Sequence, residues 1–579
     1  MISKKYLTYD EPLKTKVYDD FSGGMVSDGD AGREDAPFLL LNMEAQGKRL
    51  VSSCAPHTIS AAEPFEEGAV TASRYADGIW VFRKGHALYA YKQGVFTKIA
   101  TLTEDHGEIY DDGSFFYIID GETIFSLSRD LQLALVEQTV PVCFTGLSRS
   151  GAYFTQIAPM NPFCRYIDVW LSDEAENEQK FPVSWAVDPT YARAWHSDGK
   201  EVYPGYLVLH EDRVIFDGDE AKGCRLRLRL LDSDDEDIYS FSSLADYRNL
   251  LSDPQGAHDL SFENGRGFLL LAHDTEIYGV RLTDGFHVHS PLQITTKDCL
   301  RKITGLVPFE DGFLIFFEDA VKKLYVAPDG DGLSFSVSSL KYDFGSDMSG
   351  SIVYLDDKIV FASSLGGVCC IDRFGIDEKI GCRAVSANIA KGDHGFFSHT
   401  ADEYRRATAF AAFGKYYLSI GDRTYIWDYR AKLPSAAQTR KQEESMVWSV
   451  SNLIRAEKYL ACPDGKLYYM EQDSHTLLTL DHGGEDASFS QMITANLDLG
   501  TVGDKVLLEC GLRYRAACAV RLSLSCDGQP YMEEYTFPAC ESFTLRTFRI
   551  PGKRFEKLSL TVSSEGAFSA DALIFHYFA

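Results

Sequence analysis

The sequence predicts an all-β protein built on a β-propeller of about six to eight blades, with an inserted β-sandwich-like domain and a C-terminal β-sandwich. A hairpin phrase, in which two short apolar runs flank a tight turn and an aromatic-rich strand follows, recurs seven times. Between adjoining copies the turns lie 35 to 57 residues apart, near the roughly 40 to 50 residues that four short strands need. The composition, 13% aromatic with 46 Gly, suits many strands and turns.

Each copy of the phrase has the period-two alternation of a β-strand. In the sixth copy Tyr416, Leu418 and Ile420 face one way, and Tyr425 and Trp427 share a face after the turn. A single hairpin cannot bury such a face, so neighbouring sheets must stack, as propeller blades do. A set of unrelated hairpins in a large β-sandwich is the alternative. The seven copies occupy residues 75–91, 109–127, 267–280, 309–326, 352–371, 409–429 and 453–470.

The first 60 residues are typical of an extended arm. They have too few alternating apolar positions for a fold of their own, so we expect residues 1–60 to lie over the body of the protein or over a neighbour. Glycines such as Gly23 and Gly24 make isolated ordering costly in entropy, and the strand edge of a neighbouring subunit would offset that cost. The propeller itself is assigned to residues 61–140 and 262–495.

Two further β domains complete the predicted organisation. Residues 141–261 interrupt the repeat and are expected to form an inserted β domain. Its acidic run, residues 232–237, is typical of a solvated loop, with a cation site as the alternative. Apolar and polar positions alternate regularly in residues 496–579, which predicts an antiparallel sandwich whose sheets each expose one face to solvent.

The charge of the chain argues against a nucleic-acid-binding protein. The net charge is −28 and the isoelectric point is near 4.9, so the cationic contacts that neutralise phosphates are scarce. We expect DNA to be at most a passing, weakly contacted duplex. Residues 501–579 are neutral, with nine Lys/Arg and nine Asp/Glu. If the protein bound DNA tightly, the phosphate-binding patch would consist of Arg513, Arg515, Arg521 and Arg549.

Neither an export signal nor a disulfide framework is visible. The chain has no apolar stretch of 18 residues and its N-terminus lacks the apolar core of a signal peptide, so we expect no membrane-spanning segment. Thirteen cysteines include no Cys-x-x-Cys pair, and an odd number without a signal peptide indicates folding in reducing cytoplasm. Buried free thiols are expected in the apolar strands, at Cys224, Cys369, Cys370, Cys510 and Cys518.

The sequence also lacks the marks of an enzyme. Propellers host glycosidases that use paired carboxylates, but the sialidase Asp-box is absent, and Asp77, Asp112 and Asp311 precede Gly at tight turns, where Asp supports the backbone. No phosphate-binding loop and no His-Glu-x-x-His motif occurs. We therefore expect no enzymatic activity and no cofactor.

Possible metal ligands are sparse in the sequence. His287 and His289 could share a strand face, but no Cys or acidic partner lies nearby, and a satisfied or exposed pair is the favoured interpretation. Two acidic loops resemble calcium loops without the twelve-residue ligand pattern, and we expect no metal site. Their residues are Asp28, Asp30 and Glu34 in the first, and Asp329 and Asp331 in the second.

One ordered set of phrases resembles a known family. Phe-Ser-Gly-Gly-Met at residues 21–25 is followed by a Pro, a leucine run and Asn-Met at residues 37–43, and later phrases at 382–389, 415–429 and 512–526 agree in order. Together they resemble the β-propeller virion proteins of tailed bacteriophages and prophages, in the tail-nozzle and packaged-DNA stabilisation (tail-hub) class. The resemblance implies a non-enzymatic structural protein of the virion, assembled in the bacterial host cytoplasm.

The same resemblance implies how the protein is used. It predicts a head-to-tail connector, tail hub or nozzle-like ring protein that assembles with copies of itself and with neighbouring phage proteins. A carbohydrate-binding tail or surface adhesin is an alternative, which exposed tryptophans in the insertion (Trp170, Trp185 and Trp195) would favour, and a propeller glycoside hydrolase is another. The residues assigned to the assembly arm are Phe21, Gly23, Gly24, Met25, Pro37, Leu39 and Asn42.

Overall fold

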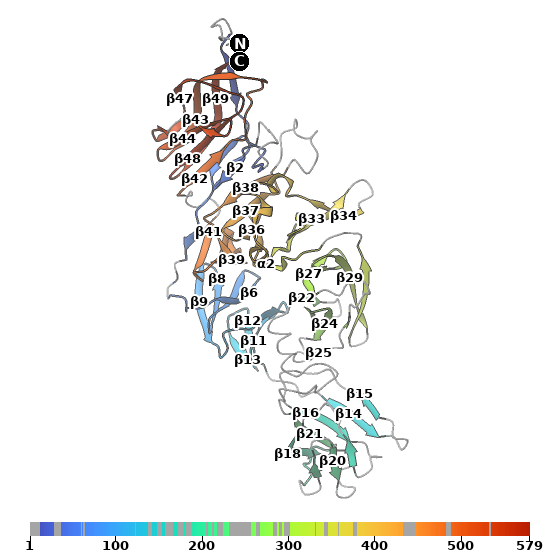
Figure 1. Ribbon diagram of the computed structural model, residues 1–579. Helices are drawn as coiled ribbons and strands as arrows, with labels where there is room; N and C mark the ends of the chain where they lie inside the picture. The colour runs from blue at the N-terminus through green and yellow to red at the C-terminus, as the bar shows by residue number, and fades with distance from the viewer. Residues whose placement is uncertain are drawn as a thin grey trace. The chain divides into compact units, whose positions relative to one another are not determined.

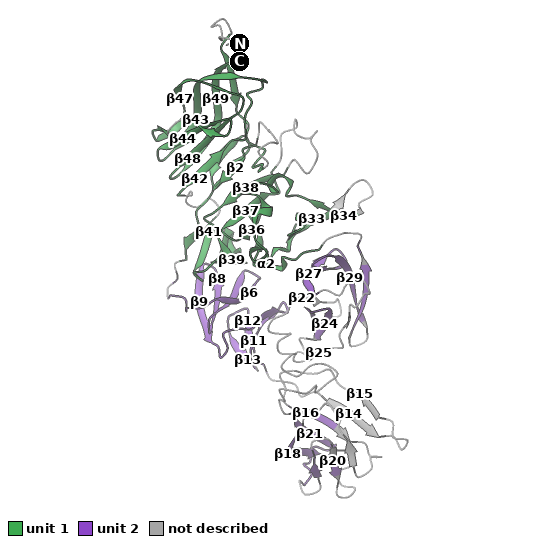
Figure 2. Ribbon diagram, in the orientation of Figure 1, with its two compact units in different colours: residues 1–60, 342–579 green, residues 61–341 purple. Residues whose placement is uncertain are grey.

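A computed structural model describes most of the chain, which packs as two compact units. Unit 1 comprises residues 1–60 and 342–579, and unit 2 comprises residues 61–341 (Figure 2). The described residues are 12–27, 36–59, 61, 64–121, 123–136, 142–147, 153–156, 166–171, 178–180, 187–203, 207–210, 213–216, 224–230, 256–261, 267–281, 287–288, 292–293, 302–329, 332–340, 345–356, 358–374, 379–431, 446–481, 488–531 and 534–579.

Unit 2 contains four antiparallel meanders of the propeller-blade type (Figure 1). Consecutive strands are hydrogen-bonded neighbours in each sheet, and the third sheet has a fifth strand. The sheets are β6 (Val70–Ala76), β7 (Ile79–Lys84), β8 (Ala87–Lys92) and β9 (Val95–Thr101); β10 (Ile109–Asp111), β11 (Phe115–Asp120), β12 (Thr123–Ser128) and β13 (Leu133–Leu135); β22 (Gly256–Ser261), β23 (Gly267–His273), β24 (Glu276–Arg281), β25 (His287–Val288) and β26 (Leu292–Gln293); and β27 (Ile303–Phe309), β28 (Gly312–Phe317), β29 (Val321–Asp329) and β30 (Gly332–Ser339).

Neighbouring blades of unit 2 stack through their first strands. β6 contacts β10, and β22 contacts β27, so the first strand of each meander is the edge that approaches the next sheet. Between the first two blades, Val81, Leu88, Phe116 and Ile118 are fully buried in one hydrophobic cluster. The face that a single hairpin could not bury is therefore buried against the next sheet.

The insertion in unit 2 is built of two small sheets. One has the order β15 (Tyr153–Gln156), β14 (Val142–Leu147), β16 (Tyr166–Leu171), β21 (Arg225–Leu230) and β18 (Val187–Trp195), with β14 and β16 parallel; the other has β17 (Glu178–Lys180), β20 (Arg213–Phe216) and β19 (Leu207–Leu209). β22 pairs with β23 along its whole length. Residues 256–261 therefore belong to the third blade and not to the insertion, where the sequence analysis had placed them.

Unit 1 contains three more blade sheets, and the predicted all-β propeller fold is confirmed. All seven predicted hairpins form strands of seven separate sheets. The three in unit 1 are β31 (Val353–Leu355), β32 (Lys358–Ser363), β33 (Gly367–Phe374) and β34 (Lys379–Ala384); β35 (Thr408–Ala412), β36 (Lys415–Ile420), β37 (Arg423–Asp428) and β38 (Val447–Ser451); and β39 (Ala456–Ala461), β40 (Lys466–Glu471), β41 (Leu477–Asp481) and β5 (His57–Thr58). The short helix α2 (Ala401–Arg405) precedes β35, and Thr400 and Glu403 cap it reciprocally.

The C-terminal sandwich faces one sheet against another. The first sheet has the order β3 (Met43–Gln46), β4 (Arg49–Ser52), β49 (Phe568–Phe578), β43 (Lys505–Ala516) and β47 (Cys540–Phe555), with β1 (Lys14–Tyr18) also paired to β49. The second has β42 (Ser490–Ile493), β48 (Leu558–Ser564), β44 (Val520–Cys526), β45 (Gln529–Pro530) and β46 (Tyr535–Phe537). Alternate residues of β44 and β48 are buried, which confirms the predicted one-sided pattern.

The N-terminal residues are woven into unit 1 and do not form a separate arm. β1, β3 and β4 are strands of the sandwich, and β5 completes the last blade. β2 (Leu39–Leu41) pairs with β38 of a blade and with β42 of the sandwich. Short strands without a sheet of their own thus pair with edges of the same chain. Of the two placements expected for this segment, the one over the body of the protein is found for residues 12–27 and 36–58, whose partners lie in unit 1, and the expected ordering against a neighbouring subunit is corrected for them.

Candidate functional site

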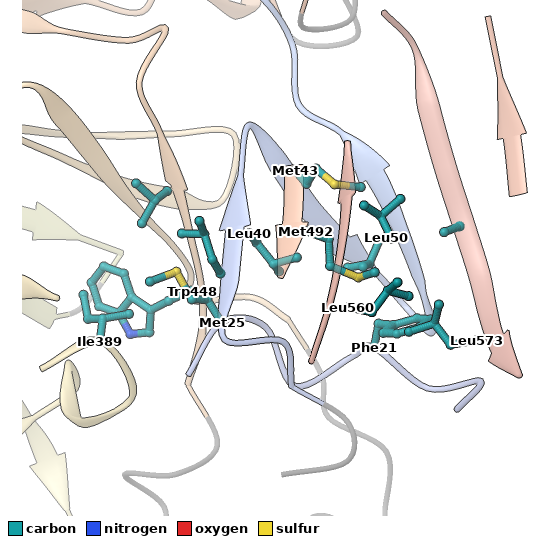
Figure 3. Close-up of a cluster of buried hydrophobic side chains, with 14 of the residues drawn as sticks. Phe21, Met25, Leu40, Met43, Leu50, Ile389, Trp448, Met492, Leu560 and Leu573 are labelled. Carbon is teal, nitrogen blue, oxygen red and sulfur yellow. The ribbon is translucent and has the colours of Figure 1, made fainter. Parts of the chain in front are cut away.

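The predicted arm residues gather where β2 joins the blade to the sandwich. Through β2, a single ten-stranded sheet runs from β35 of the blade to β45 of the sandwich. Buried side chains surround this passage (Figure 3), and we call them the junction core. Each is at most 3% exposed, and they are Phe21, Met25, Leu40, Met43, Leu50, Ile389, Trp448, Met492, Leu560 and Leu573.

Gly24 is the point of closest backbone approach in the junction. Its φ is +65°, and a Cβ placed there would lie 2.7 Å from the backbone nitrogen of Trp448 and 3.0 Å from its oxygen. The next residue, Met25, donates its N–H to the Trp448 carbonyl at 2.7 Å. Glycine is required here because both the left-handed conformation and the missing side chain are used. Gly23 is buried beside it in the turn.

Met25 and Pro37 hold the chain against the blade. The buried Met25 side chain packs in the junction core near Trp448 (Figure 3). The Trp448 indole stacks on Trp427 at 5.9 Å and donates to the Val385 carbonyl at 2.8 Å. The Pro37 carbonyl accepts the N–H of Val26 at 2.9 Å. The two ends of the arm, before and after residues 28–35, are therefore hydrogen-bonded to each other as well as to the blade.

Asn42 ties three strands together through one amide. Its Nδ2 donates to Asn452 Oδ1 at 2.8 Å and to the Phe489 carbonyl at 3.0 Å, and its Oδ1 accepts from Ser451 Oγ at 2.8 Å and from the Asn452 N–H at 3.2 Å. The residue is 1% exposed with φ +53°, a conformation that Asn tolerates better than most residues. Leu39, at 1% exposure, pairs with Ile493 next to it.

Sequence reasoning missed the partners of these residues. Trp448, Ser451, Asn452 and Asn388 lie some 350 to 430 positions away from the arm, and no local pattern marks them. The arm itself is marked by its phrase, and the structure brings four of its seven residues against β38 or β42: Gly24, Met25, Leu39 and Asn42. Pro37 is hydrogen-bonded to Val26 within the arm.

The turn carboxylates are bound locally. Asp112 accepts the N–H groups of Ser114 and Phe115, both at 2.7 Å, and the Tyr117 hydroxyl at 2.9 Å. Asp77 has φ +51° in the β6–β7 turn. Asp311 accepts from Lys323 Nζ at 2.7 Å. Asp112 is thus engaged by its own turn, as the turn interpretation predicts, whereas the side chains of Asp311 and Asp77 are paired with Lys323 and with Arg129, the latter at 3.3 Å.

Most of the predicted metal-ligand candidates fall outside what the structure describes. His289, Asp28, Asp30, Glu34 and Asp331 lie outside the described residues, as does the acidic run 232–237. His287 and Asp329 lie in β25 and β29, but their side chains are not among those described. Within the described residues, no group of three or more His, Cys, Asp or Glu side chains is placed to hold a metal ion.

The basic residues of the sandwich do not form one patch. Arg513 lies 3.5 Å from Asp571 in the first sheet. Arg521 belongs to β44 of the other sheet, where Glu565 lies 2.9 Å from its guanidinium. Arg515 and Arg549 lie in β43 and β47 of the first sheet. A phosphate-facing patch made of all four residues is therefore not present.

The tryptophan and cysteine predictions have mixed outcomes. The Trp195 ring is covered by the guanidiniums of Arg225 and Arg227, at 5.3 and 5.4 Å from its centre; Trp185 and the Trp170 side chain lie outside the described part. All described cysteines are free thiols, but Cys518 is exposed, because it lies in the turn between β43 and β44. Burial raises the pKa of Cys370 to about 12.

No helix among the described residues is long and apolar enough to cross a membrane.

Comparisons with known proteins give only distant structural likeness. No family model and no curated protein matches the chain. Among solved structures it is similar to virginiamycin B lyase from Staphylococcus aureus (TM-score 0.27, 6% identity, 63% of this chain and 95% of that one). It is also similar to the AfRom2 CNH domain (0.33, 7%, 74% and 99%) and to an exo-β-1,3-galactanase from Phanerochaete chrysosporium (0.21, 6%, 90% and 99%). These TM-scores are below 0.5, so the likenesses say nothing of activity or partners.

Proposed function

We propose that the protein is a structural component of a tailed-phage or prophage particle: a head-to-tail connector, tail hub or nozzle-like ring protein that assembles with copies of itself and with neighbouring virion proteins. It would be assembled in the bacterial cytoplasm and end in the virion. The resemblance of the Phe21–Met25 and Pro37–Met43 phrases motivates the proposal. In the fold, both phrases lie at the junction between the blade and the sandwich, which gives the proposal a physical basis.

The observation that carries the proposal is the continuous ten-stranded sheet through β2. Separate domains are usually joined by flexible linkers, which let them move relative to each other. Here a blade and the sandwich share one hydrogen-bonded sheet, and the junction core is buried on both sides of it. A stiff joint of this kind suits a protein that must keep its parts aligned within a particle.

The charge distribution supports a role beside DNA without gripping it. Residues 61–341 hold 45 Asp/Glu against 25 Lys/Arg, so this unit repels a duplex. Among the described residues, Asp112 is bound by turn N–H groups, Asp311 by the Lys323 side chain, and Asp77 lies 3.3 Å from the guanidinium of Arg129. These points favour a scaffold over a propeller hydrolase.

The proposal is tested by locating the protein in particles. Prophage induction in the source strain, followed by gradient purification and mass spectrometry of the particles, should find its peptides in a fixed ratio to the capsid protein. Negative-stain images of the purified protein should show rings. A protein that is absent from purified particles and stays monomeric at all concentrations would contradict the proposal.

A further inference from the structure

Unit 1 contains a cavity of about 1050 Å³ that the proposed structural role does not use. It lies where the β3–β4 hairpin, strands β36, β37 and β41 of two blades, and β43, β47 and β49 of the sandwich meet. We call it the seam cavity. A volume of this size matches that of small-molecule binding sites, which are roughly 300 to 1,000 Å³.

One wall of the seam cavity is aromatic and aliphatic. Phe413, at the β35–β36 turn, has a partly exposed ring that meets the Tyr417 ring edge-to-face at 6.5 Å and 90°. Ile426, Ile454 and Leu480 continue this wall. Such a surface accepts the apolar face of a ligand, because burying it against carbon atoms removes both from water.

The same wall carries a hydroxyl that has no protein partner. Tyr417 is 4% exposed, and its hydroxyl makes no hydrogen bond to another described residue; the oxygen is not among the fully enclosed polar atoms, so it is open to the cavity. Burial raises the pKa of Tyr417 well above its usual value, so the group keeps its proton and remains a donor. Ser53, also in the lining, has a buried Oγ without a partner in that same part of the chain. Buried polar groups normally find a partner, which here a ligand can supply.

The charges around the cavity nearly balance. Glu44 and Lys415 form an ion pair in the wall. On the sandwich side, Arg515 and Glu541 are exposed, and the Arg515 guanidinium lies 5.9 Å from the centre of the Phe543 ring. A third carboxylate in the lining, Asp481, lies 3.3 Å from Lys466. An anionic ligand would meet the carboxylates of Glu44, Asp481 and Glu541, and a cationic one would meet Lys415 and Arg515. The lining therefore favours a neutral ligand with many hydroxyl groups, which can donate to the carboxylates and accept from the cations.

We propose that the seam cavity binds a neutral oligosaccharide of two or three sugar units. The C–H face of one ring packs on Phe413, and its hydroxyls bond to the Tyr417 hydroxyl and to the charged groups. The site is independent of ring assembly, since every lining residue belongs to unit 1 of one chain. A peptide, or a small anion held by Lys415 and Arg515, is the competing occupant that the test distinguishes.

The test screens the full-length protein on an array of neutral and acidic glycans, with titration calorimetry of the neutral trisaccharides that bind. Tyr417→Phe removes only the hydroxyl and should weaken binding about tenfold, the loss of one hydrogen bond of about 1.4 kcal/mol. Glu541→Gln, at an exposed position, should weaken it several-fold. Tyr535→Phe makes the same chemical change at an exposed sandwich residue outside the cavity and should leave the affinity unchanged.

Three results would overturn the proposal. The first is an array on which no neutral glycan binds. The second is neutral-glycan binding that is equal in the Tyr417→Phe, Glu541→Gln and unaltered proteins, which would place the site elsewhere. The third is preferential binding of acidic glycans or inorganic phosphate in the same assays, which would identify an anion site. If the unaltered protein were absent from purified particles, that result would contradict the proposed structural function and would leave the glycan site untouched.

Discussion

Replacing Gly24 by alanine should destabilise unit 1 far more than the loss of a glycine alone explains. Two costs add at this position. The φ of +65° is left-handed, which costs an L-residue about 1–2 kcal/mol. The new Cβ would also lie 2.7 Å from the Trp448 backbone nitrogen, and forcing the backbone of β38 away from it costs about 1–3 kcal/mol. We expect Gly24→Ala to lower the free energy of unfolding by about 2–5 kcal/mol.

Gly47 offers a matched control in the same unit. Its φ is +62°, nearly that of Gly24, but a Cβ there would have nothing within 4 Å. Gly47→Ala should therefore cost only the conformational part, about 1–2 kcal/mol. The difference between the two variants isolates the close approach of the arm to β38.

The comparison uses urea unfolding and hydrogen exchange. Unfolding curves followed by tryptophan fluorescence give the two stabilities, and exchange measured by mass spectrometry on peptides covering β38 shows whether the loss begins at the junction. Faster exchange in β38 is expected for Gly24→Ala alone. Equal stabilities of the two variants, with β38 protected in both, would refute the described packing of the arm.

The remaining predictions concern single side chains. Asn42→Ala should cost about 2–4 kcal/mol in urea unfolding, because it leaves several buried groups without partners; a loss below 1 kcal/mol would contradict the network. Iodoacetamide and peptide mapping of the native protein should find Cys518 modified first among the described cysteines, and Cys518→Ser should remove that label. Asp112→Ala should destabilise the protein by about 1–2 kcal/mol through the lost turn bonds, and more than Asp77→Ala, whose carboxylate is two-thirds exposed. Burial lowers the pKa of His399 from its ordinary 6.5, so the unfolded chain binds more protons, stability should fall as pH drops below about 6.5, and His399→Gln should flatten that decline.

The blade hairpins could be predicted from sequence because their signals are local. The turn after β6 has Asp77 and Gly78 with φ of +51° and +76°, the conformations that Asp and Gly accept most readily. Period-two alternation in segments such as β36 then marks the strands on either side. Each signal needs only neighbouring residues, and for that reason all seven copies were found.

The joint could not be predicted because its partners are distant. Leu41 pairs with Val450, and Val17 pairs with Ile574, across hundreds of residues that carry no shared pattern. A three-residue strand such as β2 also has too few positions to show alternation. The seam cavity was missed for the same reason, since its lining comes from eight separate stretches of the chain.

This long-range pairing has a consequence for how unit 1 becomes complete. β1 and β4 need β49, the last strand; β2 needs β38 and β42; and β5 needs β41. β2 therefore waits for β42, β5 for β41, and β1 and β4 for β49, and contacts of such high sequence separation form late because of the entropy of loop closure. A chain that ends before β42 cannot build the joint. If the joint aligns the protein within a particle, its dependence on β42 prevents that alignment until this strand has been synthesised.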